Sequence, residues 1–331
     1  MKVLIIGGTK FIGKEIARLS AEAGHEVTLF NRGKTTNTSP FFVINGDVNE
    51  IINYKDELFA DEPDVVVHCI ANTEKHAEDC CEIFKNTGTK VIVLSSQDCY
   101  DAFQQLVRDK ESSDFPIDES MPVTPIKYYW ENILPSREKY DKNLMTNVFI
   151  DNFQKGIIQP IIFRLPMVYG PEDYQYSHRH APIIRRIFDK RENFVLGFNA
   201  QNRIWTFGYI TNIAAAIVHS YDKEQSIGKI YNLGETKVRS WRRWCALFAE
   251  YNNWNFNFLI IPEEIIEESE TMSNSPPQHL IKDCNLYNTS TGFIEPVSLK
   301  ECIKQTFEYA IQHPEVLGEK PDYDKEDKIG I

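Results

Sequence analysis

Short apolar runs alternate with amphipathic stretches through the first half of the chain. The runs predict strands at residues 2–7, 26–31, 41–45, 65–70, 90–95 and 160–164. They are continuous rather than alternating, as in Val-Val-Val at residues 65–67, and strands buried on both faces have this pattern. The stretches between them have a helical period and predict helices at residues 11–23, 50–59, 73–86 and 135–155. This alternation predicts a parallel sheet with helices on both faces.

The second half of the chain has shorter predicted elements. Helices are expected at residues 182–190, 212–221, 240–252 and 299–313, and strands at residues 194–196, 204–207 and 229–233. Ser240 is the expected N-cap of the third of these helices. Residues 100–134 break the pattern with charges, prolines and aromatics. They predict a loop near the carboxyl ends of the strands, where ligands bind in open parallel sheets.

A glycine-rich turn joins the first strand to the first helix. Gly7 and Gly8 end the apolar run, and Gly13 lies in the first turn of the helix. Gly7 allows a tight turn, Gly13 lets the helix pack closely on the sheet, and the free N–H groups of the helix N-terminus suit an anion such as pyrophosphate. Such turns usually have a middle glycine where this chain has Lys10, whose side chain must point away from the pyrophosphate or onto a phosphate. A turn that binds nothing is the alternative.

Together the turn and the alternation predict an α/β fold, a Rossmann-type doubly wound parallel sheet with a smaller, partly interleaved C-terminal α/β domain. We expect residues 1–165 to bind NAD(P) and residues 166–331 to bind the substrate. The 331 residues are 42% hydrophobic and 12% aromatic, which is enough for a sizeable core. No apolar run approaches the roughly 18 residues of a membrane span, and we recognise no signal peptide, so we expect a cytoplasmic protein.

Charge and cysteine content argue against several kinds of site. The net charge is −12, with 48 acidic against 36 basic residues, which disfavours general binding to nucleic-acid phosphates. Part of this excess lies at residues 263–270 and 319–328, which we expect on the solvated surface. The seven cysteines are odd in number and lack paired Cys-x-x-Cys spacing. We therefore expect reduced thiols and no metal site.

The end of the second strand determines which cofactor such a fold binds. A carboxylate there hydrogen-bonds the adenosine ribose and favours NAD. This chain has neutral Asn31, followed by Arg32 and Lys34, and these cations suit a 2′-phosphate together with Lys10 across the turn. We expect NADP rather than NAD, the alternative being that these bases only cover the surface. Asp47, past the third strand, is expected near the adenine amino group or as a turn or cap residue.

Further motifs follow in order along the chain. They are residues 64–71 (Asp-Val-Val-Val-His-Cys-Ile-Ala), 93–100 (Val-Leu-Ser-Ser-Gln-Asp-Cys-Tyr), 164–171 (Arg-Leu-Pro-Met-Val-Tyr-Gly-Pro), 209–214 (Tyr-Ile-Thr-Asn-Ile-Ala) and 231–234 (Tyr-Asn-Leu-Gly). With these motifs and the turn at residues 7–13, the chain resembles the extended and atypical branch of the short-chain dehydrogenase/reductase superfamily, the NAD(P)-dependent sugar epimerase/dehydratase family. The resemblance covers most of the chain.

The resemblance implies which residues do the chemistry. Ser96 would hold the reacting substrate oxygen, Lys142 would hold the nicotinamide ribose, and Tyr140 would transfer the proton. In the family the tyrosine stands four residues before the lysine, where this chain has Glu138. Tyr140 and Lys142 would face about 200° apart on a regular helix, so they act together only if the helix begins irregularly near Tyr140. The other candidate donors are Tyr128, Tyr129 and Glu138. The remaining alternative is that the site has no proton donor.

The remaining implied contacts form two sets. Cofactor contacts would come from Gly7, Gly8, Thr9, Lys10, Phe11, Ile12, Gly13, Asn31, Arg32, Lys34, Asp47, Val48, Cys69, Ala71, Lys142, Leu165 and Pro166. Substrate contacts would come from Ser96, Tyr169, Arg179 and Arg203. The resemblance also implies a homodimer formed by the helix at residues 73–86 and the long helix after Pro135.

The implied activity is reversible hydride transfer between NAD(P) and a small molecule, a nucleotide-activated sugar or related polyol. Three alternatives remain. The displaced tyrosine favours a non-catalytic dinucleotide-binding regulator or scaffold. A one-way NADPH-dependent carbonyl reductase would consume free cofactor. The turn at residues 7–13 also resembles chloroplast stem-loop RNA-binding relatives, although the acidic balance counts against nucleic acid as a partner.

Overall fold

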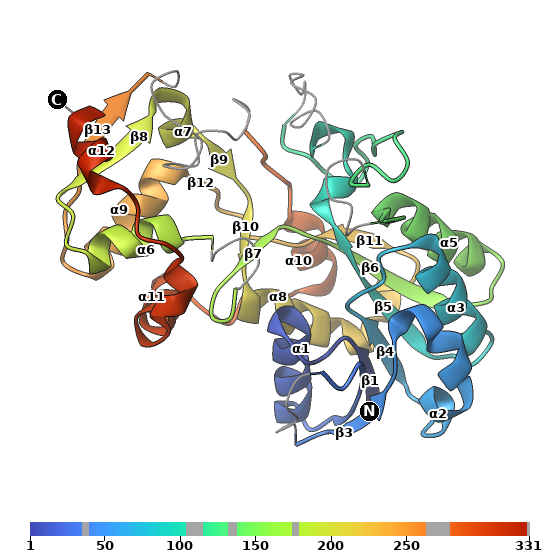
Figure 1. Ribbon diagram of the computed structural model, residues 1–331. Helices are drawn as coiled ribbons and strands as arrows, with labels where there is room; N and C mark the ends of the chain where they lie inside the picture. Colours follow the sequence, from blue (N-terminus) through green and yellow to red (C-terminus); the bar gives the residue numbers. More distant parts are fainter. Residues whose placement is uncertain (35–39, 104–114, 132–137, 174–178, 263–278, 330–331) are drawn as a thin grey trace.

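The computed structural model describes residues 1–34, 40–103, 115–131, 138–173, 179–262 and 279–329. Figure 1 shows two lobes, with the N-terminus in a lobe built on a large sheet and the C-terminus at the far end of the other lobe. The acidic run predicted at residues 263–270 lies outside the described residues. Within the described residues, no helix is long and apolar enough to cross a membrane.

A seven-stranded parallel sheet forms the first lobe. Its strands are β1 (Lys2–Ile6), β2 (Glu26–Asn31), β3 (Phe42–Asn45), β4 (Val65–His68), β5 (Lys90–Ser96), β6 (Gln159–Leu165) and β11 (Ile230–Asn232). They lie in the order β11-β6-β5-β4-β1-β2-β3, with every neighbouring pair parallel. The strands predicted at these positions are confirmed. The order reverses at β1, and ligands bind at the carboxyl ends of strands beside such a reversal.

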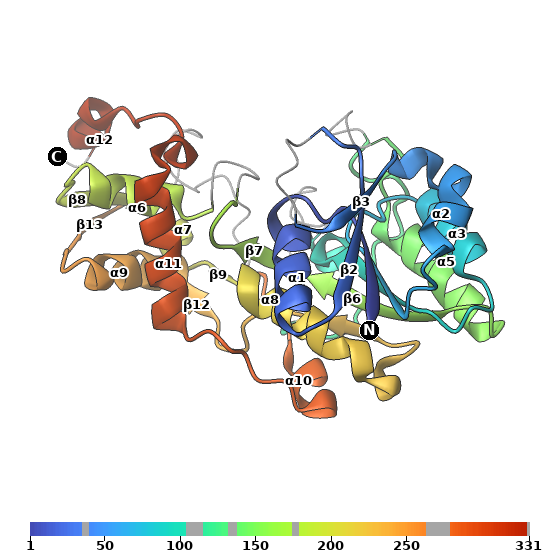
Figure 2. The ribbon, with the colours of Figure 1, turned by 90° about the horizontal axis from the view of Figure 1, so that it is seen from below.

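Helices cover both faces of this sheet, as predicted. Successive strand residues point to opposite faces, so Val3 and Ile5 pack in one core and Leu4 and Ile6 in another. On the sheet, α1 (Phe11–Glu22) and α8 (Ile210–His219) pack in the first core, which continues into the second lobe. The helices of the second core are α2 (Lys55–Phe59), α3 (Glu74–Phe84) and α5 (Lys142–Gln154). Figure 2 shows the sheet between these two layers. The doubly wound α/β fold is therefore confirmed.

The helix predicted at residues 135–155 begins later than expected. Residues 132–137 lie outside the described residues, and α5 starts at Lys142. It starts there because the Asp141 side chain accepts hydrogen bonds from two backbone N–H groups of the first turn, at 2.9 and 3.0 Å. Tyr140 therefore precedes the helix, and the angle expected between Tyr140 and Lys142 on a regular helix does not apply.

The second lobe contains pairs of short strands. These are β7 (Met167–Tyr169), β8 (Asn193–Gly197), β9 (Ile204–Trp205), β10 (Phe207–Tyr209), β12 (Arg239–Ser240) and β13 (Asn257–Ile261). They pair as β10 with β7, β12 with β9, and β13 with β8. The single strand predicted at residues 204–207 is wrong, because it is divided between two sheets. Strand β13 was not predicted.

The helices after residue 165 belong to both lobes. They are α6 (Ala181–Phe188), α7 (Phe198–Asn202), α8, α9 (Trp241–Tyr251), α10 (Asn285–Thr291), α11 (Leu299–Gln312) and α12 (Tyr323–Ile329). The predictions for α6, α9 and α11 are confirmed, and Ser240 caps α9. Strand β11 and helix α8 return to the first lobe, where α8 packs against α1. The division of the chain at residue 165 stays a prediction.

The acidic C-terminal segment is not only solvated surface, as it was expected to be. Its residues form α12, and the Glu326 carboxylate is 2% exposed. Glu326 accepts a hydrogen bond from the guanidinium of Arg186, which is 1% exposed on α6. A neighbouring pair, Asp327 with Arg191, is much more exposed. The buried pair anchors the last helix of the chain to the second lobe.

Replacing Glu326 with Gln should destabilise the protein by about 3–5 kcal/mol, because the buried guanidinium of Arg186 would lose the negative charge of Glu326 beside it. Asp327→Ala is the matched control, because it removes an exposed pair on the same helix and should cost no more than about 1 kcal/mol. Urea unfolding of both variants measures the difference. Equal losses would show that burial adds nothing to the pair in α12.

Candidate active site

The glycine turn after β1 brings the N-terminus of α1 close to the sheet. Gly7 has a φ of +90°, which favours glycine. A Cβ on Gly13 would lie 2.2 Å from the Gly7 carbonyl oxygen, so only glycine allows this approach. Lys10 is the N-cap residue and its exposed side chain does not cap the helix. The first-turn N–H groups thus have no side-chain cap, and the cradle fits an anion such as a pyrophosphate.

The end of β2 has an amide with an unused donor. The Asn31 side-chain oxygen accepts a hydrogen bond from the Gly33 backbone N–H at 2.9 Å. The Asn31 Nδ2 is buried and has no hydrogen-bond partner among the described residues. A buried donor without an acceptor is costly, and an oxygen of a bound dinucleotide would satisfy it. Arg32 and Lys34 follow with exposed side chains.

Asp47 has the cap role that the sequence left open. Its carboxylate accepts hydrogen bonds from the backbone and side-chain N–H groups of Asn49, at 3.0 and 2.9 Å. It thereby caps a 3₁₀ helix at Val48–Tyr54, which replaces the first part of the helix predicted at residues 50–59. Contacts of Asp47 and Val48 with an adenine stay a prediction.

Lys142 lies directly under the carboxyl edge of the sheet. It is 7% exposed, and its ammonium group donates to the Ala71 carbonyl (2.6 Å), the Asn72 side-chain oxygen (2.9 Å) and the Leu94 carbonyl (3.0 Å). An ammonium group has three hydrogens, so these acceptors use all of them. Ala71 follows β4 and Leu94 belongs to β5. Lys142 thus joins the ends of two central strands, and its contact with a ribose stays a prediction that requires it to exchange one of these acceptors.

Tyr140 is linked to the end of β5 by a hydrogen bond to the Asp98 carboxylate. Its hydroxyl donates to the Asp98 Oδ2 at 3.1 Å, and the Trp130 indole N–H donates to the same oxygen at 3.0 Å. The Ser96 Oγ accepts a hydrogen bond from the Asp98 backbone N–H at 3.3 Å. The Lys142 ammonium lies 5.6 Å from the centre of the Tyr140 ring. The three predicted catalytic residues therefore come together at one strand end.

Asp98 is the residue of this cluster that sequence reasoning missed. Its position was visible, two residues after Ser96 at the carboxyl end of a buried strand, where functional carboxylates are common. Its partner Tyr140 is 42 residues away in the sequence, and no local pattern indicates that contact. In the sequence, only the position of Asp98 at the end of a predicted strand could have indicated its role.

The other candidate proton donors have different surroundings. The Tyr128 hydroxyl donates to the Glu74 carboxylate at 3.0 Å, and this hydrogen bond raises the pKa of Tyr128. Tyr129 packs edge-on against Trp130, with ring centres 5.2 Å apart. The Glu138 side chain is exposed. The Tyr140 hydroxyl, by contrast, binds the carboxylate of Asp98, two residues after Ser96.

The predicted cofactor residues beyond the glycine turn lie at neighbouring strand ends. Cys69 and Ala71 follow β4, Leu165 is the last residue of β6, and Pro166 follows it. Burial raises the pKa of the Cys69 thiol to about 12, so this side chain stays neutral beside the site. Within the described residues, no group of histidine, cysteine and carboxylate side chains has the arrangement of a metal site.

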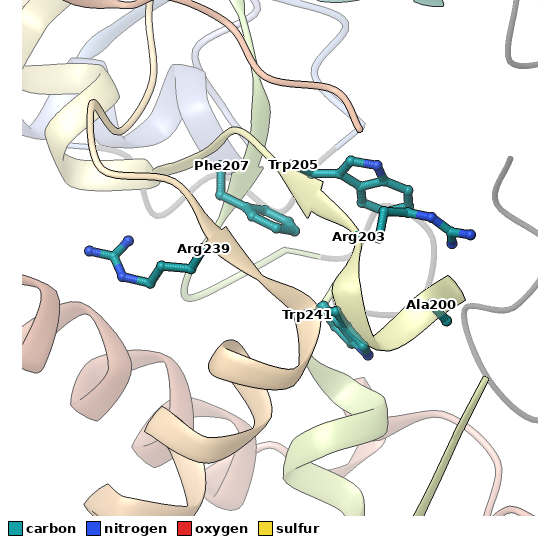
Figure 3. Close-up of a pocket in the computed structure, with 6 residues that line it drawn as sticks. All are labelled: Ala200, Arg203, Trp205, Phe207, Arg239 and Trp241. Carbon is teal, nitrogen blue, oxygen red and sulfur yellow. The ribbon is translucent and has the colours of Figure 1, made fainter. Parts of the chain in front are cut away.

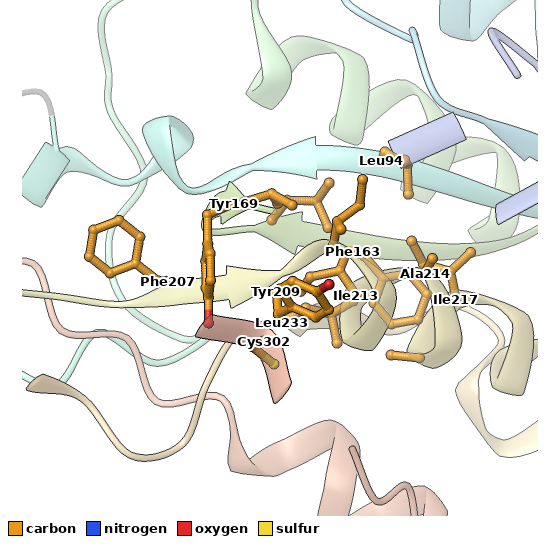
Figure 4. Close-up of a cluster of buried hydrophobic side chains, with 14 of the residues drawn as sticks. Leu94, Phe163, Tyr169, Phe207, Tyr209, Ile213, Ala214, Ile217, Leu233 and Cys302 are labelled. Atoms are coloured by element: carbon orange, nitrogen blue, oxygen red, sulfur yellow. The ribbon is translucent and has the colours of Figure 1, made fainter. Parts of the chain in front are cut away.

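The predicted substrate residues of the second lobe do not share one environment. Tyr169 is fully buried among aromatic side chains (Figure 4), and its hydroxyl donates to the Glu235 carboxylate at 2.9 Å. The Arg179 Nε donates to the Val168 carbonyl at 2.8 Å. Arg203 lines a small pocket. Substrate contacts of Tyr169 and Arg179 stay predictions, and each would have to compete with these bonds.

The pocket at Arg203 is largely aromatic. It is lined by Ala200, Arg203, Trp205, Phe207, Arg239 and Trp241 (Figure 3). The Arg203 guanidinium carbon lies 5.6 Å from the centre of the Trp205 ring. The guanidinium of Arg239 is turned away from Arg203 and Trp205, so the stem of this side chain forms the wall. Its free volume of about 10 Å³ has room for about one water, and most of its lining side chains are buried. A flat ring with an anionic group beside it would enter only after these side chains move apart. Sequence reasoning found only Arg203 in it.

A family model described as "NAD dependent epimerase/dehydratase family" matches residues 3–234. The chain belongs to the NAD-dependent epimerase/dehydratase family. The match spans the glycine turn, the end of β5 and β11, which together form the carboxyl edge described above. The predicted family is thus confirmed.

Solved structures of this family share the fold. UDP-glucose 4-epimerase of Thermotoga maritima, solved with UDP-glucose, is 16% identical with a TM-score of 0.69, over 95% of this chain and 100% of that chain. dTDP-glucose 4,6-dehydratase of Bacillus anthracis, in complex with NAD, is 13% identical with a TM-score of 0.68, over 95% of this chain and 98% of that chain.

A curated relative is the chloroplast stem-loop binding protein of 41 kDa b from Arabidopsis thaliana. It is 24% identical over 256 residues, which are 71% of this chain and 59% of the relative. The matched region therefore spans about three fifths of the length of the relative.

Replacing Gly13 with Ala should weaken dinucleotide binding by roughly tenfold or more, because the added Cβ pushes the first-turn N–H groups away from the anion. Calorimetry with NADH and NADPH measures this. Gly24→Ala is the control at the other end of the same helix, where no atom lies within 4 Å of an added Cβ. It should keep binding and lose about 1–2 kcal/mol of stability through its positive φ. Unchanged binding by Gly13→Ala would contradict the assignment of the turn.

Proposed function

We propose that the protein is an oxidoreductase of the epimerase/dehydratase type, which acts on a nucleotide-activated sugar or related polyol by reversible hydride transfer with NAD(P). The observation that carries the proposal is the cluster of Ser96, Asp98, Tyr140 and Lys142 at the end of β5. This strand end lies on the same edge of the sheet as the glycine turn, because β5, β4 and β1 are parallel neighbours. Proton-transfer groups and an anion cradle thus share one edge.

Each residue of the cluster has a distinct task in this proposal. The nicotinamide, when bound, supplies the chemistry of accepting a hydride from a substrate carbon and returning it. The Ser96 hydroxyl holds the substrate oxygen on that carbon. The Tyr140 hydroxyl would give its proton to the substrate carbonyl oxygen as the hydride returns, and the resulting phenolate would take that proton back in the reverse step. Asp98 accepts a hydrogen bond from the hydroxyl and so orients it. The Lys142 ammonium, 5.6 Å from the Tyr140 ring centre, would hold the nicotinamide ribose beside the tyrosine.

The cofactor is proposed to be NADP. Lys10, Arg32 and Lys34 are exposed, and within the described residues none of the three side chains has a hydrogen bond or ion pair. They lie at the end of the glycine turn and of β2, where the adenosine ribose is expected. Free cations at that position suit a 2′-phosphate. The NAD complex of the related dehydratase from Bacillus anthracis is the reason to test NAD beside it.

The substrate is proposed to carry a nucleoside diphosphate. Once the side chains around the small Arg203 pocket move apart, its aromatic walls would receive a base and the guanidinium would receive a phosphate. The related epimerase and dehydratase are named for a UDP-sugar and a dTDP-sugar. Both nucleotides are therefore the first probes.

A non-catalytic dinucleotide-binding regulator is the second candidate. It is favoured by the Lys142 ammonium, whose three hydrogens all have protein acceptors. An RNA-binding role is favoured by the name of the curated relative, while the net charge of −12 counts against it. Turnover separates the enzyme from both candidates.

Calorimetry with NADPH and NADH is the first experiment on the cofactor. NADPH should bind more tightly than NADH. Arg32→Ala should lower the affinity for NADPH by roughly tenfold, because it removes a charged hydrogen bond to the 2′-phosphate. Its effect on NADH should be small. Arg243→Ala, an exposed arginine of α9 in the second lobe, is the control. Preferred binding of NADH that is unaffected by Arg32→Ala would contradict the choice of NADP.

Turnover of UDP-glucose and dTDP-glucose tests the cluster at β5. Tyr140→Phe and Asp98→Asn should each lower kcat by roughly a hundredfold or more, because positioned acid–base groups contribute that much, and cofactor binding should persist. Tyr251→Phe is the matched control, since that hydroxyl also donates to a carboxylate but lies in the second lobe. If Tyr128→Phe lowered kcat and Tyr140→Phe did not, the proton donor would be Tyr128 rather than Tyr140. Cofactor binding without any turnover would favour the regulator.

A further inference from the structure

A buried carboxylate lies in the middle of the second lobe. Glu235 is 8% exposed, and its Oε1 accepts a hydrogen bond from the Tyr169 hydroxyl at 2.9 Å. Its Oε2 accepts one from the Arg239 guanidinium at 2.5 Å. The Glu235 backbone N–H donates to the Phe207 carbonyl at 2.8 Å. The Glu235 side chain thus connects β7 and β12, and its backbone binds β10.

The bond from Arg239 connects this carboxylate to the Arg203 pocket. Arg239 and Trp241 stand on either side of Ser240, and both line the pocket. Arg239 pairs with Trp205 across β12 and β9, and Trp205 also lines the pocket. Since the Arg239 guanidinium turns away from the pocket (Figure 3), Glu235 holds the charged end and the stem forms the wall.

We propose that Glu235 is a positioning residue, which acts through Arg239 to hold β12 against β9 and so shapes the pocket for the nucleoside diphosphate part of the substrate. The identity of this ligand rests on the proposed function. Glu235 itself makes no contact with the ligand. Its effect is on the position of the Arg239 stem and the Trp241 ring.

Protonation of Glu235 should control this wall. Burial raises the pKa of Glu235 to about 7, against the opposing effects of Arg239 and Tyr169, and the charge of Glu295 raises it as well. The Cys302 thiol of α11 also faces this carboxylate, and burial keeps it neutral by raising its pKa to about 12. As pH falls through 7, the carboxylate becomes neutral and its attraction for Arg239 is lost. The wall should then loosen, so nucleotide affinity should fall from pH 8 to pH 6.

The ligand-free protein provides the first test. The Arg239 guanidinium carbon lies 5.5 Å from the centre of the Trp244 ring, so its release should change tryptophan fluorescence between pH 8 and pH 6. Glu235→Gln should abolish this transition. Tyr169→Phe should move it to higher pH, because the hydrogen bond from Tyr169 lowers the pKa of Glu235. Glu295→Gln should move it to lower pH, because the charge of Glu295 raises the pKa of Glu235. A transition that survives in Glu235→Gln would overturn the proposal.

Binding of UDP provides the second test. At pH 8, Glu235→Gln should bind UDP roughly tenfold more weakly than the wild type, while its affinity for NADPH stays unchanged. With a turned-over sugar nucleotide, KM should rise and kcat should change little, because the residue acts on binding alone. Equal UDP affinity in wild type and Glu235→Gln would overturn the proposal. If the wild type binds no UDP, the proposed substrate class fails, while the fluorescence titration still decides the role of Glu235.

Discussion

The site depends on one buried ammonium group, that of Lys142. Carbonyl groups at the ends of parallel strands have no further strand to bind, and burial makes an unsatisfied carbonyl costly. Lys142 satisfies those of Ala71 and Leu94, so it fixes the ends of β4 and β5 relative to each other. Because α5 begins at this lysine, Tyr140 lies outside the helix and reaches Asp98. The positions of the two strand ends, the start of α5 and Tyr140 therefore all depend on Lys142.

A second lysine repeats this arrangement further along the sheet. The Lys282 ammonium donates to the Arg164 carbonyl (2.9 Å) and the Leu233 carbonyl (3.0 Å), at the ends of β6 and β11. Burial lowers the pKa of Lys282 to about 8. Its backbone pairs with Ile117 of the first lobe, and Leu280 pairs with Trp205 of the second, so this segment connects the lobes. Two buried lysines thus give the carboxyl edge positive charge in an acidic protein, which favours anionic ligands there.

The sequence predicted those parts of the molecule that depend on local patterns. The strands of the large sheet were recognisable because burial on both faces leaves continuous apolar runs such as residues 65–67. The start of α5 was missed because the cap at Asp141 is a local choice among several polar residues. Asp98 and Glu326 were missed for a different reason, since their partners are 42 and 140 residues away. Long-range pairs of polar side chains leave no periodic signal.

Burial of the Glu235 carboxylate gives fold stability and pocket order opposite dependences on pH. Its pKa is higher in the folded protein than in an unfolded chain, so its contribution to stability is complete in acid and is lost as pH rises through about 7. The ionised form, which holds Arg239, is therefore the form that folding favours less. The second lobe should be most stable where its pocket is least ordered. A substitution that stabilises this core with a neutral side chain would gain stability at the expense of the ligand.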